Sequence, residues 1–177
     1  MTANYFPLFT LALSLPLSAR PAVFLTPDDF AEDWRISKQF TIAVAEKMPA
    51  ASYDFKATPE ERSFGEQMTH IAESLFERFS EISAITPVKS AIPRKITKEF
   101  VIERLNQSFD YVIQVLPKLT DVQLSTARFN VDFEGRAGPE INGRDMIMNI
   151  FIHVAHHRAQ CEVYLRLKGI TPPVYRF

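Results

Sequence analysis

A run of twenty-five residues without proline or glycine, from 144 to 168, most constrains how this chain can fold. Within the run, apolar and histidine residues recur every three or four positions, the spacing of one side of an amphipathic helix. These positions are Met146, Ile150, His153, Val154, His157, Cys161, Tyr164 and Leu165. Gly169 then offers a helix end, and Pro172-Pro173 prevents continuation. The pattern predicts a long helix over 144–168.

Three earlier stretches share this periodicity. The first opens with Thr26-Pro27-Asp28-Asp29, a capping sequence with acids near the positive end of the helix dipole, and predicts a helix over 28–48. The others predict helices over 62–83 and 98–117, where Pro117 ends or kinks the last one. Four amphipathic helices in one domain favour an antiparallel bundle. The expected fold class is therefore all-α, a four-helix bundle.

The segment 120–143 has no lasting period and contains three glycines and a proline. Only residues 129–133 alternate like a short strand or extended arm. We therefore expect a long loop before the last helix, and such a loop commonly carries function or covers a site. The connection at 86–96 contains two prolines and is long enough for a crossover between helices.

Composition restricts the class of protein further. A chain of 177 residues can bury a sizeable core, and fifteen phenylalanines with only five glycines favour helices with aromatic packing. The formal net charge is −1, without a block of like charges, so we expect no nucleic-acid partner. The single cysteine, Cys161, excludes an intrachain disulfide.

Residues 1–25 form an N-terminal apolar segment, and the bundle domain is expected over 26–177. The apolar run 5–19 is too short and too interrupted by prolines to cross a bilayer, so no transmembrane segment is expected. It is similar to the apolar region of a secretory signal peptide, although no Lys or Arg precedes it. The alternative is an arm packed on the body of the protein. Both readings stay open, and with them a cytoplasmic or an exported location.

His153 and His157 lie four residues apart in the predicted last helix, so their imidazoles share one side about one turn apart. Such a pair can bind one divalent transition metal. The alternative is two core or interface histidines that bind backbone or carboxylate groups. His156 points toward another side and is left out. His70 falls by periodicity among glutamates, away from the apolar stripe of its helix, so spacing alone makes it an exposed histidine.

Several polar residues near these histidines are candidates for supporting roles. Asn149, Glu73 and Gln160 lie three or four positions from a histidine and can accept the second N–H of a metal-bound imidazole. Ordinary helix-surface pairs are the alternative for all three. Arg158 can bind a substrate anion or form a salt bridge, and Cys161 is expected as a small buried core residue.

The segment HVAHHRAQCEVYLRLKGITPP, from His153 to Pro173, resembles the C-terminal signature of the DinB/YfiT-like metalloprotein superfamily. Ala159 stands where the family usually has glycine. A second block, RSFGEQMTHIA from Arg62 to Ala72, is also similar to the family, in which its histidine is the first metal ligand. The matching positions in the first segment are His153, His157, Arg158, Gln160, Tyr164, Leu165, Arg166, Gly169, Pro172 and Pro173.

This resemblance implies the family's four-helix bundle, its frequent homodimer, and one divalent metal held by His70, His153 and His157. Zinc or nickel is the expected ion, and iron or manganese also fits, because imidazole ligands alone do not select one of these metals. Relatives are described as metal-dependent hydrolases or as transferases and isomerases that use a low-molecular-weight thiol. The expected function is therefore a metal-dependent enzyme, a hydrolase or a thiol S-transferase, acting on a small molecule. The alternative is a non-catalytic dimeric bundle with a structural metal. The sequence identifies no catalytic residue beyond the metal ligands.

Overall fold

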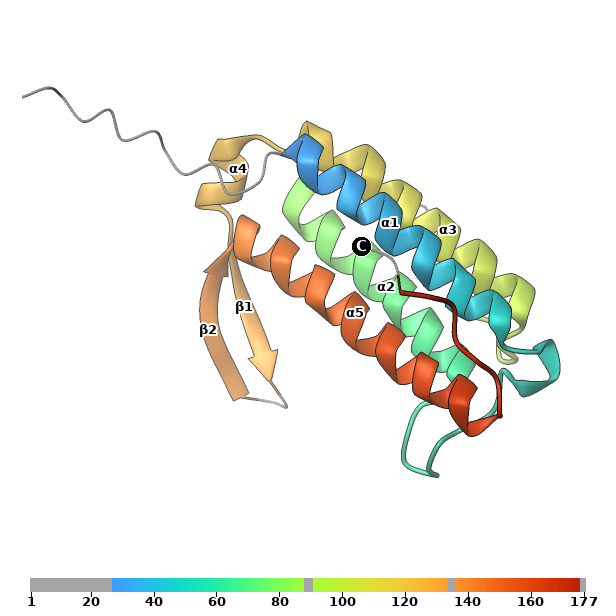
Figure 1. Ribbon diagram of the computed structural model, residues 1–177. Helices are drawn as coiled ribbons and strands as arrows, with labels where there is room; N and C mark the ends of the chain where they lie inside the picture. Colours follow the sequence, from blue (N-terminus) through green and yellow to red (C-terminus); the bar gives the residue numbers. More distant parts are fainter. Residues whose placement is uncertain (1–26, 88–90, 134–135, 176–177) are drawn as a thin grey trace, which may run out of the picture.

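A computed structural model describes residues 27–87, 91–133 and 136–175 of the chain. Four long helices form one bundle: α1 (Pro27–Lys47), α2 (Phe64–Ser83), α3 (Lys98–Val115) and α5 (Gly143–Leu167) (Figure 1). Each helix packs mainly against two others, α1 and α2 both lying against α3 and α5. The all-α four-helix fold is thereby confirmed.

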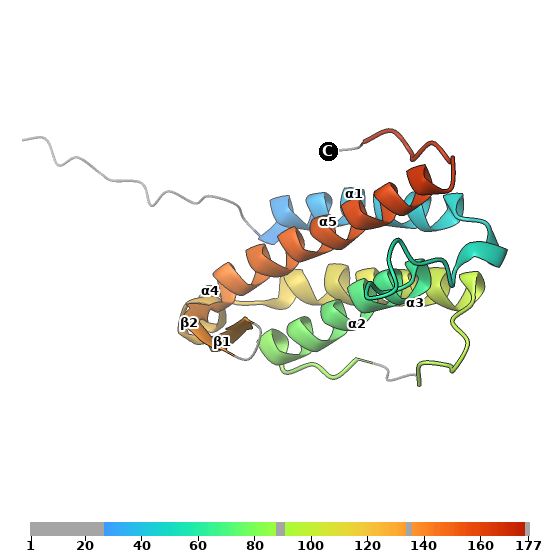
Figure 2. The ribbon, with the colours of Figure 1, turned by 90° about the horizontal axis from the view of Figure 1, so that it is seen from below.

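The bundle is not antiparallel throughout. The chain returns from the end of α2 along the length of the bundle before α3 begins, so that α2 and α3 run in the same direction (Figure 2). Side-chain contacts agree, because Glu73 on α2 binds Arg104 on α3, and Tyr111 further along α3 bonds to the carbonyl of Ile85 beyond the end of α2. The connection at 86–96, which was expected to be long enough for a crossover, therefore forms one.

Trp34 lies at the centre of the core. Its ring contacts Phe30 on α1 itself and one phenylalanine on each of the other three long helices, with centroid separations of 5.1 to 6.1 Å. Its partners there are Phe79, Phe109 and Phe151. The indole is completely buried, and edge-on or tilted geometries predominate, as expected for aromatic rings in close contact. One side chain of α1 therefore contacts each of the other three long helices.

The start of α2 is fixed in two ways. Ser63 caps the helix in a capping box, in which its hydroxyl accepts from Glu66 N–H and its own N–H donates to the Glu66 carboxylate. Gly65 allows the preceding link to approach closely, because a Cβ there would lie 3.0 Å from the Tyr53 carbonyl oxygen and 3.0 Å from Ile96 Cγ2. The segments around residues 53–62 and 92–96 are thus held against α2.

The expected loop before the last helix is instead a short helix, α4 (Asp121–Thr126), and a hairpin of β1 (Arg128–Phe133) and β2 (Arg136–Asn142). The alternating residues 129–133 do form a strand. Two signals explain the difference. Thr120 and Gln123 form a capping box that starts α4. β2 was not predicted because it contains Gly138-Pro139, and both residues disfavour strands.

The expected helix bounds agree with the structure to within two residues, and α3 ends at Val115 because Pro117 belongs to a short 3₁₀ turn. The N-terminal segment 1–25 lies outside the described residues, and so does Thr26. Within the described ranges, none of the helices combines the length and the apolar character needed to cross a bilayer.

The core arrangement predicts a large effect of truncating Trp34. Trp34→Ala should lower the free energy of unfolding by about 3–5 kcal/mol, because the cavity would face all four long helices. Urea denaturation followed by circular dichroism measures this. Val122→Ala, at an exposed side chain, is the control and should change stability by less than about 0.5 kcal/mol. Similar losses in both variants would contradict the central role of the indole.

Candidate metal centre

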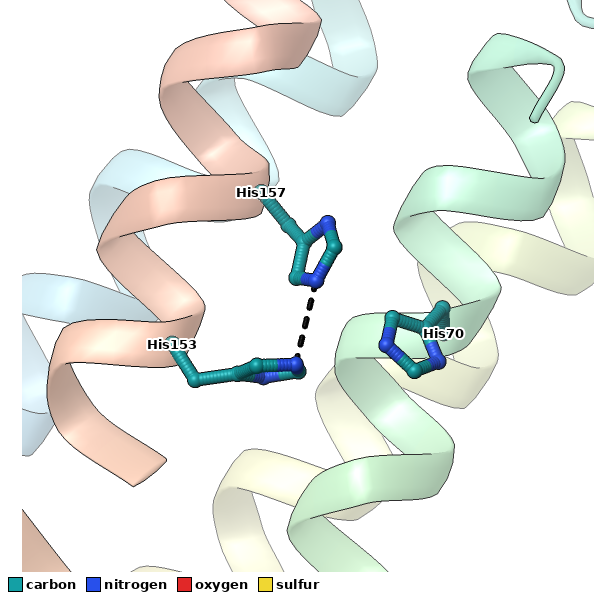
Figure 3. Close-up of side chains that lie close together, drawn as sticks. All are labelled: His70, His153 and His157. Atoms are coloured by element: carbon teal, nitrogen blue, oxygen red, sulfur yellow. Dashed lines mark hydrogen bonds between the residues drawn. The ribbon is translucent and has the colours of Figure 1, made fainter. Parts of the chain in front are cut away.

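The three histidines His70, His153 and His157 lie together between α2 and α5 (Figure 3). Their ring centroids are 4.4 to 5.0 Å apart, and one nitrogen from each ring lies within 4.8 Å of the other two. The helical spacing of His153 and His157 places both rings on the side of α5 that faces α2. The structure thus brings together the residues that the sequence resemblance grouped.

His70 reaches the cluster from the flank of α2, where apolar periodicity gave no sign of burial. Gln67 and Ser74, three positions before and four after it, are buried although polar. α2 contacts both α3 and α5, so its buried surface is wider than its apolar stripe. The spacing of apolar residues reveals only the part of a helix surface that is both buried and apolar. Because the buried surface around His70 is polar, spacing alone predicted an exposed His70.

Two glutamines orient His157. Its Nδ1 lies 2.8 Å from Gln67 Oε1 and 3.0 Å from Gln160 Oε1. Because both partners are acceptors, Nδ1 carries the proton and donates it, which leaves the lone pair on Nε2. Gln160 was a predicted partner. Gln67 was missed, and its position one turn before His70 on the same helix was the available signal.

His153 is left with an unsatisfied nitrogen. Its Nε2 lies 3.0 Å from His157 Nε2, and its Nδ1 is buried without a hydrogen-bond partner. If His153 is protonated at Nε2, the Nδ1 lone pair stays unpaired; if it is protonated at Nδ1, two lone pairs face each other. Either arrangement costs free energy. A cation between the two Nε2 atoms would accept both lone pairs, so the residues present fit a divalent metal.

The surroundings keep all three imidazoles neutral. Burial, and to a smaller extent neighbouring positive charges that include Arg62 in every case, lower the pKa of His70, His153 and His157 to about 4 each. Neutral imidazole is the form that binds a metal. The cluster is therefore ready to act as a ligand set at neutral pH.

Two of the predicted supporting residues act elsewhere. Glu73 was expected beside His70 but forms an ion pair with Arg104, with Nε 2.6 Å and Nη2 3.1 Å from its carboxylate oxygens. Arg104 is buried and stacks on the Phe76 ring, so it attracts the carboxylate away from the histidines. Asn149 is exposed, and no hydrogen bond to a histidine is recorded for it among the described residues.

The remaining residues near the pair lie outside the cluster. Within the described residues Arg158 does not form the expected salt bridge: its guanidinium is buried against α1, donates to the hydroxyls of Ser37 and Thr41, and lies over the Phe40 ring. Cys161 is a buried core residue as expected, and burial raises the pKa of its thiol well above the ordinary range. His156 is exposed and does not belong to the three-histidine group.

A pocket of about 560 Å³ adjoins the cluster at His70. One face of α2 forms part of its wall, and the segments before α2 and before α3 supply the rest. Ten residues line it: Lys56, Glu60, Glu61, Arg62, Glu66, Thr69, His70, Glu73, Ile92 and Ile96. A small molecule in this pocket would lie against one of the three candidate ligands.

The low imidazole pKa values predict how the metal-free protein responds to acid. The unfolded chain takes up protons on these histidines near pH 6.5, whereas the folded protein does so only near pH 4. The free energy of unfolding should therefore fall as the pH drops from about 6.5 to about 4. Urea titrations of chelator-treated protein measure this. His153→Gln removes one titrating group and should reduce the slope; an unchanged slope would contradict the assignment.

Comparison with known proteins agrees with this architecture. Residues 34–161 match the model of the DinB superfamily. A DinB-like protein from Bacillus cereus superposes with a TM-score of 0.66 at 17% identity, covering 84% of this chain and 97% of its own. A DinB-like protein from Bacillus subtilis gives 0.62 at 21% identity, covering 82% and 96%. No protein of curated function matches the sequence. The family match spans most of the bundle, from Trp34 to Cys161, and the chain belongs to the DinB superfamily.

Proposed function

We propose that the protein binds one divalent transition metal through His70, His153 and His157 and uses it as a metal-dependent enzyme on a small molecule. The observation that carries the proposal is the convergence of three neutral imidazoles whose nitrogens lie within 4.8 Å of one another, one of them next to a pocket. The ion we propose is zinc or nickel, and iron or manganese also fits, because imidazole ligands alone do not select one of these metals.

Each residue around the cluster has a defined part in this proposal. Gln67 and Gln160 hold the Nδ1–H of His157, so its Nε2 is the ligand atom. His70 connects the centre to the pocket. A divalent metal supplies Lewis acidity, which suits the activation of water for hydrolysis or the ionisation of a thiol for transfer. Three protein ligands leave a coordination position open for the water or the thiol.

The two proposed reaction classes, hydrolysis and low-molecular-weight-thiol transfer, differ in what occupies the open position. A screen of ester hydrolysis and thiol transfer, made with the metal restored, separates them. The second candidate function is a non-catalytic dimeric bundle with a structural metal. The pocket beside His70 favours the enzyme, because a structural site is generally closed by four protein ligands.

The metal proposal predicts which histidine variants lose the metal and which retain it. His70→Ala, His153→Ala and His157→Ala should each lower zinc content sharply, because each removes one of three ligands. His156→Ala, on the same helix but outside the cluster, is the matched control and should retain the metal. Gln67→Leu should weaken affinity about 10–100-fold by releasing His157 Nδ1. Mass-spectrometric metal analysis and zinc titration measure these effects. Full metal content in His70→Ala would overturn the three-histidine site.

We also propose a homodimer formed by the outer side of α5. Met148, Ile152 and Val163 are exposed there, and Leu167 continues the apolar row to the helix end. Phe151 on the same helix does not belong to this row, because it packs on Trp34. Exposed apolar residues along one helix are typical of an association surface. We propose that α1 also contributes to this interface.

The dimer proposal predicts that a charge on the apolar row separates the subunits. Ile152→Asp should convert a dimer into a monomer, because an aspartate would be desolvated at the interface. Light scattering coupled to size-exclusion chromatography at micromolar concentration measures the mass. Val174→Asp, at an exposed position after α5, is the control. A monomeric unmodified protein would contradict the proposal.

A further inference from the structure

Two arginines act electrostatically on the histidine cluster, although glutamates also line the pocket beside His70. All charged side chains that perturb the three imidazoles are basic: Arg62 acts on each of them, and Arg78 acts on His153. No carboxylate is among these influences. A divalent ion on three neutral imidazoles would therefore keep its full positive charge and have further cations nearby. Such a site favours a negatively charged group on the molecule that it binds.

Arg62 is the basic residue placed to receive that group. It precedes the N-cap Ser63, and its backbone carbonyl accepts a 2.9 Å hydrogen bond from the Tyr164 hydroxyl of α5. Its position relative to the cluster is thus set from both α2 and α5. Arg62 is exposed, and in the described part of the chain its guanidinium makes no ion pair or hydrogen bond, although its charge lowers the pKa of Glu66.

The other arginines near the cluster are already occupied. Arg78 pairs with Glu81 at 3.1 Å, and Arg104 binds Glu73. Neither of them lines the pocket, whereas Arg62 and His70 both do. Arg62 therefore combines a guanidinium without an ion pair, access to the pocket, and an electrostatic effect on every imidazole of the cluster.

The pocket contains a second unsatisfied group. Thr69 lines it next to His70, is only 4% exposed, and its hydroxyl oxygen has no hydrogen-bond partner. A buried polar group without a partner is costly, and a polar ligand would remove that cost. Ile92 and Ile96 add apolar wall. The pocket therefore suits a small organic molecule with both polar and apolar parts.

The acidic residues of the pocket do not oppose a negative ligand strongly. The Glu73 carboxylate is neutralised by Arg104, and that of Glu66 accepts the Ser63 N–H at the positive end of α2. Glu60 and Glu61 are exposed, so solvent screens their charges. Lys56 adds a second cation to the lining.

We propose that this pocket binds a small organic anion and that Arg62 holds its carboxylate, so that the rest of the molecule lies beside His70. Arg62 is thus a residue that determines substrate specificity. This inference rests on the proposed metal centre, because it assigns the substrate class of that same site.

Two thiols that differ only by a carboxylate test the assignment. N-acetylcysteine and N-acetylcysteamine share the thiol and the amide, but only the first is an anion at neutral pH. Zinc content is measured first by mass spectrometry. Calorimetry then gives Kd of each thiol for the zinc-loaded full-length protein and for Arg62→Gln, Arg62→Lys and Arg78→Gln. Because Arg62 is exposed and its bond to Tyr164 uses the backbone, these variants should fold normally.

Unmodified protein should bind N-acetylcysteine about tenfold more tightly than N-acetylcysteamine, the effect of one charged hydrogen bond. Arg62→Gln should remove this preference and leave zinc content and the Kd of N-acetylcysteamine unchanged. Arg62→Lys should keep most of the preference for N-acetylcysteine, and Arg78→Gln should keep all of this preference. Equal affinities in the unmodified protein, or a preference that survives Arg62→Gln, would overturn the role of Arg62 alone. If the unmodified protein binds none of zinc, nickel, iron and manganese, the metal centre and this inference are overturned together.

Discussion

The contact of one indole with aromatic rings from every long helix sets the spacing of the whole bundle. Trp34 is completely buried and touches phenylalanines of α2, α3 and α5. Interactions of this kind contribute about 0.5–1.5 kcal/mol each beyond the burial of area. Because rigid rings fill the centre, the helices cannot approach or separate freely. The distance between α2 and α5, and therefore the distance between their histidines, follows from this packing.

The edge between α2 and α5 is polar, in contrast to that centre. Gln67 is almost fully buried and bonds to His157, and Tyr164 bonds across to the carbonyl of Arg62. A buried polar edge is stable only when its groups have partners. The exceptions here are His153 Nδ1 and the Thr69 hydroxyl, which both lie at or beside the cluster. Among the described residues a third buried group without a partner, Trp34 Nε1, lies in the core, so two of the three lie at this edge of the bundle.

Sequence reasoning found those features that depend on local spacing. Helix bounds and the His153/His157 pair follow from periodicity, which survives in the fold because each helix buries one side. His70 came only from family resemblance, because its burial depends on a neighbouring helix that no local pattern encodes. Gln67 was missed although its position one turn before His70 was a local signal. An antiparallel bundle was expected, and the parallel course of α2 and α3 was not predicted, because the long connection at 86–96 is compatible with either direction.

Arg158 has a consequence for how α1 and α5 fit together. Its guanidinium binds hydroxyls of Ser37 and Thr41, which are four residues apart and thus one turn of α1 from each other. If α5 slid by one turn along α1, about 5.4 Å, the cation would lose at least one acceptor while staying buried. Apolar side chains tolerate such a shift more easily, because one methyl group can replace another. The buried guanidinium of Arg158 therefore stabilises the observed register of α5 on α1 over one shifted by a turn. Apolar packing alone would leave these two registers close in free energy.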